Sequence, residues 1–304
     1  MNRKIRIADN TRFLRKEAEM KFLVLGCNGM AGHTISIYLK ERGHDVYGFD
    51  KRPSSFVPST FGDAMDPVII KELIGINRYN TIINCIGLLN QVAEDNHAEA
   101  AYLNGYFPHY LAKLTQDSHT QIIHMSTDCV FSGKRGQYTE DDVRDGETFY
   151  DRSKALGELD DNKNVTLRCS IVGPDINPRG IGLLNWFMKQ DGEIKGYATA
   201  IWTGQTTLQL AKTMEAAALK KINGLYNAVP NRAISKYDLL VLFNKYIRCN
   251  RLKIIPVDTI VADKSLKRTH YGSFDYIIPD YEVMIKELAD WMLKHQVLYP
   301  HYKF

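Results

Sequence analysis

The sequence has few cysteines, and they do not form the pattern that a disulfide framework or a zinc site needs. Five cysteines stand far apart in 304 residues, at positions 27, 85, 129, 169 and 249, without a CxxC pair. An odd number at wide spacings argues against both kinds of site. The nine histidines are dispersed and none belongs to an HExxH motif, so no metal site is expected. This cysteine usage predicts a reducing cytoplasm as the compartment.

Long apolar runs and a strong excess of charge are also missing. No run reaches the length of a membrane span and no signal peptide is visible, so no membrane contact is expected. The formal net charge is only +4, with lysines and arginines scattered among acids, which argues against a nucleic-acid partner. A basic stretch from Asn2 to Lys16 is the one local excess, and residues 1–19 are interpreted as an N-terminal arm.

Short apolar runs alternate with helical patterns over the first half of the chain. Strands are expected at residues 22–26, 45–50, 81–87, 121–125 and 165–172, with helices that include 98–116 and 150–160. Continuous apolar runs of this length are typical of buried parallel strands. The alternation predicts an α/β fold, a Rossmann-like doubly wound parallel sheet whose ligands bind beyond the carboxyl ends of its strands.

The first predicted strand runs into a glycine-rich turn. Gly26, Gly29 and Gly32 follow at three-residue steps, with Asn28 inside the turn, and an amphipathic run over 34–39 comes next. Such a turn brings backbone N–H groups and the positive end of a helix against a pyrophosphate. It therefore predicts a dinucleotide site, although glycine triplets also occur in ordinary turns.

The second predicted strand ends in an acid, Asp50, 24 residues after Gly26. A carboxylate at this place can accept hydrogen bonds from the adenosine ribose of NAD. Lys51 and Arg52 follow directly and could pair with the 2′-phosphate of NADP. The choice between NADH and NADPH therefore stays open.

Two later segments fall where the same nucleotide would pass. Asp63 and Ala64, in a Gly-Asp-Ala turn, lie at the spacing where a loop acid meets the adenine amino group; a polar surface turn is the alternative. Cys85, Ile86 and Gly87 end a strand with a small, flexible residue that lets the backbone approach a cofactor, and a plain strand end is the alternative.

The pattern changes after Gly173-Pro174. Residues 175–182 are rich in Pro, Gly and Asn and read as a loop. The remainder mixes short strands with helices expected at 208–219, 236–246 (with Ser235 as N-cap) and 281–295. We therefore predict an NAD(P)-binding Rossmann domain over 20–174, together with parts of 200–230, and a smaller, interleaved α/β substrate domain over 175–304.

Tyr150 and Lys154 stand four residues apart on a predicted helix and so share one face. A phenol has a pKa of about 10, and a nearby ammonium lowers that value, so the pair reads as a proton donor with its activator. The lysine can also hold a nicotinamide ribose. Thr127 ends a predicted strand 23 residues upstream of Tyr150, and its hydroxyl could hydrogen-bond a substrate carbonyl.

At these residues the chain resembles the extended short-chain dehydrogenases/reductases, and most closely the dTDP-4-dehydrorhamnose reductase family. STDCVFSG (126–133) is similar to the STDYVF-x-G segment of that family, and the YxxxK pair matches its catalytic pair. Three shorter segments also resemble it, LRCSIV (167–172), AIWTG (200–204) and GLYN (224–227). The resemblance covers roughly residues 20–250. It implies reduction, by NADPH or NADH, of the 4-keto group of a nucleotide-linked 6-deoxy-4-keto sugar, for surface polysaccharide or O-antigen precursors.

The resemblance also implies a role for each matching residue. Gly29, Met30 and Ala31 would contact the pyrophosphate, Asp50 the ribose, Asp63 and Ala64 the adenine, and Cys85, Ile86 and Gly87 the nicotinamide side. The other cofactor candidates are Gly26, Asn28, Gly32, Lys51, Arg52, Tyr150 and Lys154. Tyr150 would donate the proton, Lys154 would activate it, and Thr127 would meet the carbonyl. Thr127, Asp128, Cys129 and Ile171 are the residues expected to face the substrate.

Three departures from the family pattern lie where the protein would recognise the sugar or its nucleotide. Cys129 replaces a tyrosine, Ile171 replaces a tryptophan, and the segment 267–269 does not follow the family pattern. The substrate could therefore differ, and a UDP-linked N-acetylated 6-deoxy hexulose is the rival.

Two other functions stay open. Cys129 stands two residues after Thr127, the offset of the catalytic cysteine in GDP-fucose synthases, which suggests an epimerase-reductase for a UDP- or GDP-linked sugar; Asp175 stands where that family has a histidine. The second is a non-catalytic NADP-binding subunit, like the regulatory beta subunit of methionine adenosyltransferase. Related enzymes often dimerise, so a homodimer is an expectation.

Overall fold

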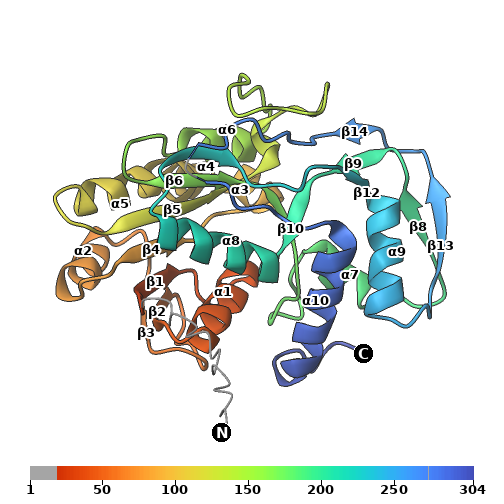
Figure 1. Ribbon diagram of the computed structural model, residues 1–304, viewed down its shortest axis with the longest axis horizontal. Helices are drawn as coiled ribbons and strands as arrows, with labels where there is room; N and C mark the ends of the chain where they lie inside the picture. Colours follow the sequence, from red (N-terminus) through yellow and green to blue (C-terminus); the bar gives the residue numbers. More distant parts are fainter. Residues whose placement is uncertain (1–18, 273) are drawn as a thin grey trace, which may run out of the picture.

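The computed structural model describes residues 19–272 and 274–304, so the predicted N-terminal arm lies outside the described residues except for Glu19. A seven-stranded parallel sheet forms the centre, with the strand order β11-β6-β5-β4-β1-β2-β3 (Figure 1). Its strands are β1 (Lys21–Leu25), β2 (Asp45–Asp50), β3 (Ser59–Phe61), β4 (Thr81–Asn84), β5 (Gln121–Ser126), β6 (Val165–Arg168) and β11 (Gly224–Asn227). The predicted doubly wound α/β sheet is confirmed. Its order reverses between β1 and β4, where such folds bind their ligands.

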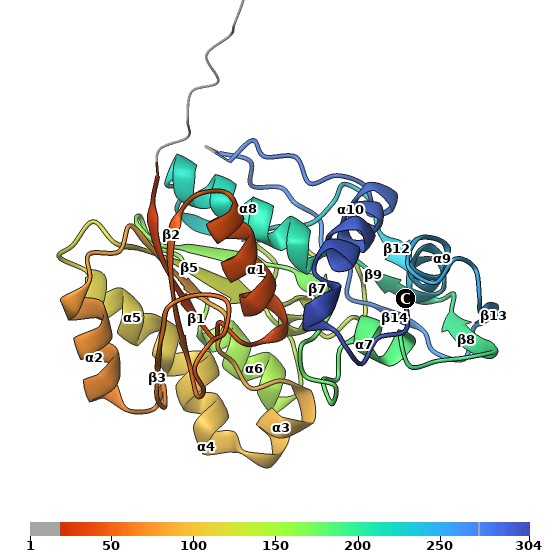
Figure 2. The ribbon, with the colours of Figure 1, turned by 90° about the horizontal axis from the view of Figure 1, so that it is seen from below.

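Helices cover both faces of this sheet (Figure 2). The face with the larger apolar cluster carries α1 (Met30–Glu41) and α8 (Thr207–Lys220). The opposite face carries α2 (Pro67–Ile76) and α5 (Phe107–Thr115). Beside α5 lie the remaining helices of this layer, α3 (Asn90–Asp95), α4 (His97–Ala100), the π-helical segment η1 (Ala101–Tyr106) and α6 (Phe149–Leu156). The sheet is therefore shielded from water on both sides, as its apolar strands require.

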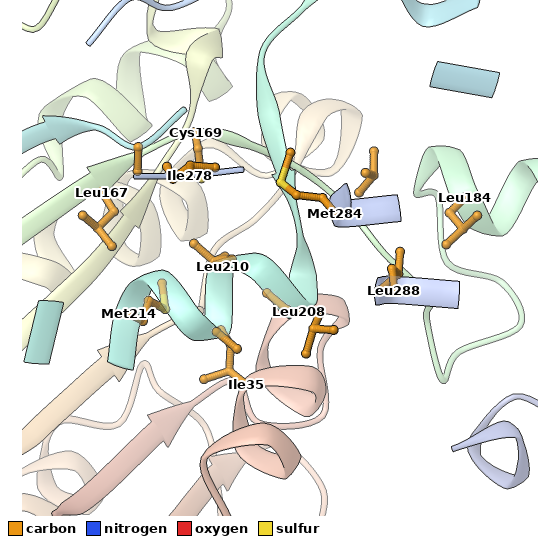
Figure 3. Packing of buried hydrophobic residues seen from close by; sticks show 14 of the residues in the cluster. Ile35, Leu167, Cys169, Leu184, Leu208, Leu210, Met214, Ile278, Met284 and Leu288 are labelled. Carbon is orange, nitrogen blue, oxygen red and sulfur yellow. The ribbon is translucent and has the colours of Figure 1, made fainter. Parts of the chain in front are cut away.

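The larger core cluster joins the sheet layer to the C-terminal part of the chain. Ile35 of α1 and Met214 of α8 are fully buried between these two helices (Figure 3). Met284 and Leu288 extend the same cluster from α10 (Tyr281–Lys294). Burial of each such side chain contributes about 1.5–3 kcal/mol, so α10 is held to the sheet layer by packing.

Smaller sheets follow the large one. β7 (Ser170–Val172) pairs with β10 (Gly204–Thr206), and β8 (Glu193–Tyr197) pairs with β13 (Lys253–Val257). A three-stranded sheet has the order β12-β9-β14, from Ile234–Ser235, Ala200–Trp202 and Ala262–Asp263. The helices here are α7 (Leu183–Phe187), α9 (Lys236–Tyr246) and α10, and short 3₁₀ turns occur at η2 (Asp128–Val130) and η3 (Gln296–Leu298). The division into two domains stays a prediction. β11, which falls within the range 200–230, lies in the large sheet.

Most predicted elements are found, but several differ. The predicted strand 81–87 ends at Asn84, and the predicted helix 150–160 ends at Leu156. The predicted strand 165–172 is wrong as one element, because it breaks at Cys169 and β7 leaves the large sheet to pair with β10. The predicted helix 98–116 is α4, η1 and α5 in succession, with a π-helical turn in the middle. By contrast α9 has its predicted bounds, and the Ser235 hydroxyl caps it by accepting from the N–H of Asp238 at 2.9 Å.

Within the described part of the chain, no helix combines the length and apolar character that a membrane span needs. Among the same residues, no group of three or more His, Cys, Asp or Glu side chains is arranged to hold a metal ion.

Candidate active site

The glycine turn lies between β1 and α1 at the point where the sheet order reverses. Gly26 adopts a left-handed conformation, with φ +78°, and its carbonyl oxygen accepts from the N–H of Gly29 at 3.0 Å. A Cβ on Gly32 would stand 2.0 Å from the Gly26 oxygen, so only glycine lets α1 start this close to β1. The N-cap of α1 is Gly29, which has no side chain to bind the N–H groups of the first turn. These N–H groups and the helix dipole suit a phosphate anion. Met30 and Ala31 form this first turn, half-buried and buried respectively.

Asp50 ends β2 beside the glycine turn. Its carboxylate accepts from the N–H of Asn28 at 3.0 Å and from the N–H of Lys51 at 2.8 Å. The Asn28 side chain donates to the carbonyl oxygen of Arg52 at 2.8 Å. The Asp50 carboxylate keeps further lone pairs for a ligand hydroxyl. Asp50 therefore holds the turn in shape as well as being a candidate ribose partner.

The residues predicted to contact a 2′-phosphate or the adenine lie at the edge of the glycine turn region. The Lys51 Nζ is 3.8 Å from a carboxylate oxygen of Asp63, and both side chains are exposed. Arg52 is exposed too, whereas Ala64 is buried in the core cluster below. Asp63 accepts from the N–H of Met65 at 3.0 Å, within the polar turn that the sequence offered as the alternative.

The loop after β4 runs against the glycine turn. A Cβ on Gly26 would meet the backbone of Cys85 and the side chain of Ile86 at 3.3 Å. A Cβ on Gly87 would stand 2.9 Å from Oδ1 of Asn104, so glycine is needed there as well. The segments predicted to contact the pyrophosphate and the nicotinamide side of one dinucleotide thus lie side by side.

Asn104, which the sequence analysis missed, fixes this loop. Its Oδ1 accepts from the N–H of Leu88 at 2.8 Å, and its Nδ2 donates to the Leu88 oxygen at 2.9 Å and to Oγ of Ser153 at 3.1 Å. Asn104 is fully buried in η1, and Ser153 lies on α6. The one pattern in the sequence that could have indicated Asn104 is its place as a polar residue on the apolar face of the predicted helix 98–116. Asn104 therefore ties the loop after β4 to the helix that carries Tyr150 and Lys154.

Thr127 and Tyr150 meet at the carboxyl end of β5. The Tyr150 phenol is buried, with 7% of the residue exposed, and Thr127 is close enough to lower the pKa of the phenol, against the effect of burial. A capping box of Thr148 and Asp151 starts α6 and so places Tyr150 in its first turn. Burial raises the pKa of Tyr150, and charge on Cys129 adds to the rise. The direction is opposite to the lowering that the sequence predicts from a lysine one turn away, because desolvation of the phenolate is the largest cause of the shift.

Lys154 follows one turn later on α6 and is buried. Its Nζ donates to the carbonyl oxygen of Met125 at 2.7 Å and lies 3.4 Å from Nε2 of His124. Burial lowers the pKa of Lys154 to about 8, against the opposing effects of Glu158 and Cys85. The lysine therefore gives up its proton far more easily than an exposed lysine does.

The residues expected to face the substrate do not all lie together. Asp128 and Cys129 follow Thr127 directly, and the Cys129 N–H donates to Oγ1 of Thr127 at 3.1 Å. Burial raises the pKa of Asp128 and, with the charge on Asp128, raises that of Cys129 to about 12. Ile171 is half-buried in β7, outside the large sheet, and pairs with Gln205 of β10.

The C-terminal segment supports the glycine turn from behind. His33 of α1 lies 2.9 Å from the carbonyl oxygen of Gly29 through Nδ1 and 2.8 Å from the Tyr299 hydroxyl through Nε2. Burial lowers the pKa of His33 to about 4, so the ring is neutral at pH 7. Tyr302 reaches the loop after β7, where its hydroxyl accepts from the N–H of Asp175 at 2.9 Å. Tyr299 and Tyr302 thus connect the glycine turn to the loop after β7.

A parallel Rossmann sheet with a buried tyrosine and lysine one turn apart beside a threonine is the arrangement of the short-chain dehydrogenase/reductase class. The chain belongs to the family described as RmlD substrate binding domain, whose model matches residues 20–292.

Two proteins similar to this chain are a glycan biosynthesis reductase and a sugar-nucleotide reductase. It is 34% identical over 143 residues to a probable low-salt glycan biosynthesis reductase, Agl14, of Haloferax volcanii, and these residues cover 46% of this chain and 48% of that protein. The chain thus spans about half the length of Agl14. It is 28% identical over 255 residues to a dTDP-4-keto-6-deoxy-D-glucose reductase of Streptomyces niveus, covering 80% and 84% of the two chains.

Among solved structures, a dTDP-4-dehydrorhamnose reductase from Bacillus anthracis in complex with NADP superposes with a TM-score of 0.75. The identity is 21%, with 89% of this chain and 98% of that chain covered. This likeness supports the fold.

Proposed function

We propose that the protein is an NAD(P)H-dependent reductase of the 4-keto group of a nucleotide-linked 6-deoxy-4-keto sugar. One observation carries the proposal: Tyr150, whose pKa is raised by burial, lies beside Thr127 at the carboxyl end of β5, with Lys154 one turn further on. Membership of the reductase family and similarity to two sugar-nucleotide or glycan reductases support the substrate class.

The residues present fit a nicotinamide dinucleotide. The close approaches at Gly26, Gly32 and Gly87 bring the glycine turn, the start of α1 and the loop after β4 together at one place. The first turn of α1 offers N–H groups to a pyrophosphate, and Asp50 offers a carboxylate to a ribose. When bound, the reduced cofactor supplies the hydride. Both NADH and NADPH are proposed, since Asp50 is followed by two exposed cations, Lys51 and Arg52.

Reduction of a ketone leaves an alkoxide that must receive a proton. The Thr127 hydroxyl can hydrogen-bond the carbonyl oxygen, which orients the sugar and stabilises the developing negative charge. The Tyr150 phenol then donates its proton to that oxygen, and its raised pKa keeps it protonated until the substrate is present. Lys154, as an ammonium, stabilises the resulting phenolate and can hold the nicotinamide ribose. The residues at hand therefore match reduction better than oxidation.

The proposal is tested with a panel of dTDP-, UDP- and GDP-linked 4-keto-6-deoxy sugars, by following oxidation of NADH and NADPH. In Tyr150→Phe we expect kcat to fall by about 10²–10⁴, the usual contribution of a positioned proton donor, while the cofactor Kd stays unchanged. Tyr106→Phe, on an exposed tyrosine of η1, is the matched control. An unchanged kcat in Tyr150→Phe would overturn the assignment.

Epimerisation before reduction has one observation in its favour, since Cys129 packs against the cluster that holds Tyr150. Its raised pKa, about 12, disfavours the thiolate that a base would need. Incorporation of deuterium from solvent at sugar C3 or C5 distinguishes the two reactions. Absence of turnover with every sugar, together with a stable complex with a second protein, would instead favour a cofactor-binding regulatory subunit.

We further propose a cytoplasmic location and a homodimer. All five cysteines are free thiols, which suits a reducing compartment. Light scattering of the purified protein tests the dimer, and a monomer at micromolar concentration would contradict it.

A further inference from the structure

A buried chain of polar side chains runs from β4 to the candidate active site. Asn84 of β4 and His124 of β5 are register partners and are fully buried. The Asn84 Nδ2 lies 3.2 Å from Nδ1 of His124, and Nε2 of that ring lies 3.4 Å from Nζ of Lys154. The mechanism proposed above uses Lys154 but gives no role to Asn84 or His124.

The backbone fixes which end of the Asn84 amide faces His124. The Oδ1 of Asn84 accepts from the N–H of Ile86 at 3.2 Å, in the loop after β4. The NH₂ group is thereby turned toward Nδ1 of His124, and an amide nitrogen can only donate. Nδ1 must therefore offer its lone pair, and a neutral ring carries its proton on Nε2. Burial lowers the pKa of His124 well below its ordinary value, and positive charge on Lys154 adds to the effect, so the ring is neutral.

The proton on Nε2 points at Lys154. An ammonium has three donors and no acceptor, so it would meet the Nε2–H donor to donor. An uncharged amine has a lone pair that accepts from Nε2–H and can still donate to the Met125 oxygen, 2.7 Å away. We propose that Asn84 and His124 are positioning residues that hold Lys154 in place and ease the loss of its proton, while the ammonium stays the form that acts in the proposed mechanism. The catalytic consequence rests on the proposed function, whereas the arrangement of protons does not.

This arrangement couples the charge of Lys154 to the loop predicted to line the nicotinamide. A charged Lys154 requires an unprotonated Nε2, and then the proton moves to Nδ1. Asn84 must rotate to accept it, which breaks its bond with Ile86. The charged and titratable groups around this centre are Glu158 after α6, Cys85 after β4, and His109 on α5, whose charge acts on His124. Glu158 and Cys85 favour the ammonium and oppose the effect of burial on Lys154.

Nitrogen-15 NMR of histidine-labelled protein reads the ring tautomer directly, without any cofactor or substrate. At a pH well above the Lys154 pKa of about 8, where the amine is uncharged, we expect His124 to be neutral with its proton on Nε2. His124→Gln assigns the signal by removing it, and His119→Gln, on an exposed histidine after α5, is the control that leaves it in place. A proton on Nδ1 of His124 in the wild-type protein at that pH would overturn the proposal.

Asn84→Asp is the variant that reverses the arrangement. One carboxylate oxygen can still accept from Ile86, and the other now accepts a proton from Nδ1. We expect the His124 proton to move to Nδ1, and the pKa of Lys154, followed by carbon-13 NMR of its ε-carbon, to rise by about one unit or more. A charge at position 84 raises that pKa by itself, so the tautomer is the decisive reading. An unchanged tautomer in a folded Asn84→Asp would also overturn the proposal, and wild-type spectra decide if this variant does not fold.

The activity data keep the two proposals separate. If the sugar reductase assignment is correct, the alkaline limb of kcat/KM in Asn84→Asp shifts to higher pH by the same amount as the pKa of Lys154. If that assignment fails, the NMR results are unaffected, because they are measured on the protein alone.

Discussion

Arg168 and Glu158 form a bidentate ion pair in the interior of the protein. Nε of Arg168 lies 2.8 Å from Oε1 of Glu158, and Nη2 lies 2.8 Å from Oε2. The Ser126 hydroxyl at the end of β5 donates to the same carboxylate at 2.6 Å, and Nη1 of Arg168 donates to Asn227 of β11 at 3.2 Å. The pair thus joins the ends of β5, β6 and β11 to the residues after α6. It fixes Thr127, directly after Ser126, relative to the helix that carries Tyr150 and Lys154.

Breaking this pair should destabilise the protein strongly. In Glu158→Gln the fully buried guanidinium of Arg168 loses its counter-charge, and we expect the free energy of unfolding to fall by about 3–5 kcal/mol. Urea denaturation measures it. Glu147→Gln, which breaks an exposed pair with Lys134, is the control and should show no resolvable loss. Equal effects of the two substitutions would contradict a structural role for the buried pair.

A methyl group at position 32 tests the glycine turn. In Gly32→Ala the new Cβ would stand 2.0 Å from the Gly26 oxygen, so α1 must move away from β1. Overpacking of this kind costs about 1–3 kcal/mol, and we expect cofactor Kd, measured by fluorescence titration, to rise by about ten-fold or more.

The control for this substitution lies in another helix. A Cβ on Gly75 in α2 meets no atom within 4 Å, so Gly75→Ala should leave cofactor affinity unchanged and raise the melting temperature slightly. Unchanged affinity in Gly32→Ala would show that the turn does not hold the pyrophosphate.

Local patterns in the sequence were sufficient to predict the parallel sheet and the candidate catalytic pair. The strand 45–50 and the helix 236–246 have their predicted bounds, because an apolar run between turn residues and a serine cap are encoded within the segment itself. The spacing of Tyr150 and Lys154 likewise predicts a shared helix face, and both side chains are buried on α6.

Features that depend on register or on burial could not be predicted. Asn84 meets His124 because β4 pairs with β5 in the observed register, and His124 meets Lys154, 30 positions later in the chain, because α6 packs beside β5. The break at Cys169 depends on a partner strand 35 residues away, since Ser170 pairs with Gly204. The sign of the pKa shift at Tyr150 depends on the depth of burial, which the spacing of tyrosine and lysine does not encode.

Lys154 should make the stability of the protein depend on pH. In the unfolded chain a lysine keeps its proton up to about pH 10.4, whereas burial lowers the pKa of Lys154 in the folded protein to about 8. Between these values the unfolded state binds more protons, so the free energy of unfolding rises with pH, by roughly 3 kcal/mol at most. Lys154→Met removes this contribution, and Lys71→Met, on an exposed side chain of α2, is the control.

The difference in unfolding free energy between wild type and Lys154→Met is the quantity to measure, by urea denaturation at several pH values from 7 to above 10. Other groups that titrate in this range act on both proteins and cancel in the difference. We expect the wild type to gain stability relative to Lys154→Met as the pH rises through about 8 and beyond, because its buried ammonium is being neutralised. A difference that stays constant over this range would mean that Lys154 keeps its ordinary pKa, and the bias toward the uncharged amine would then be refuted as well.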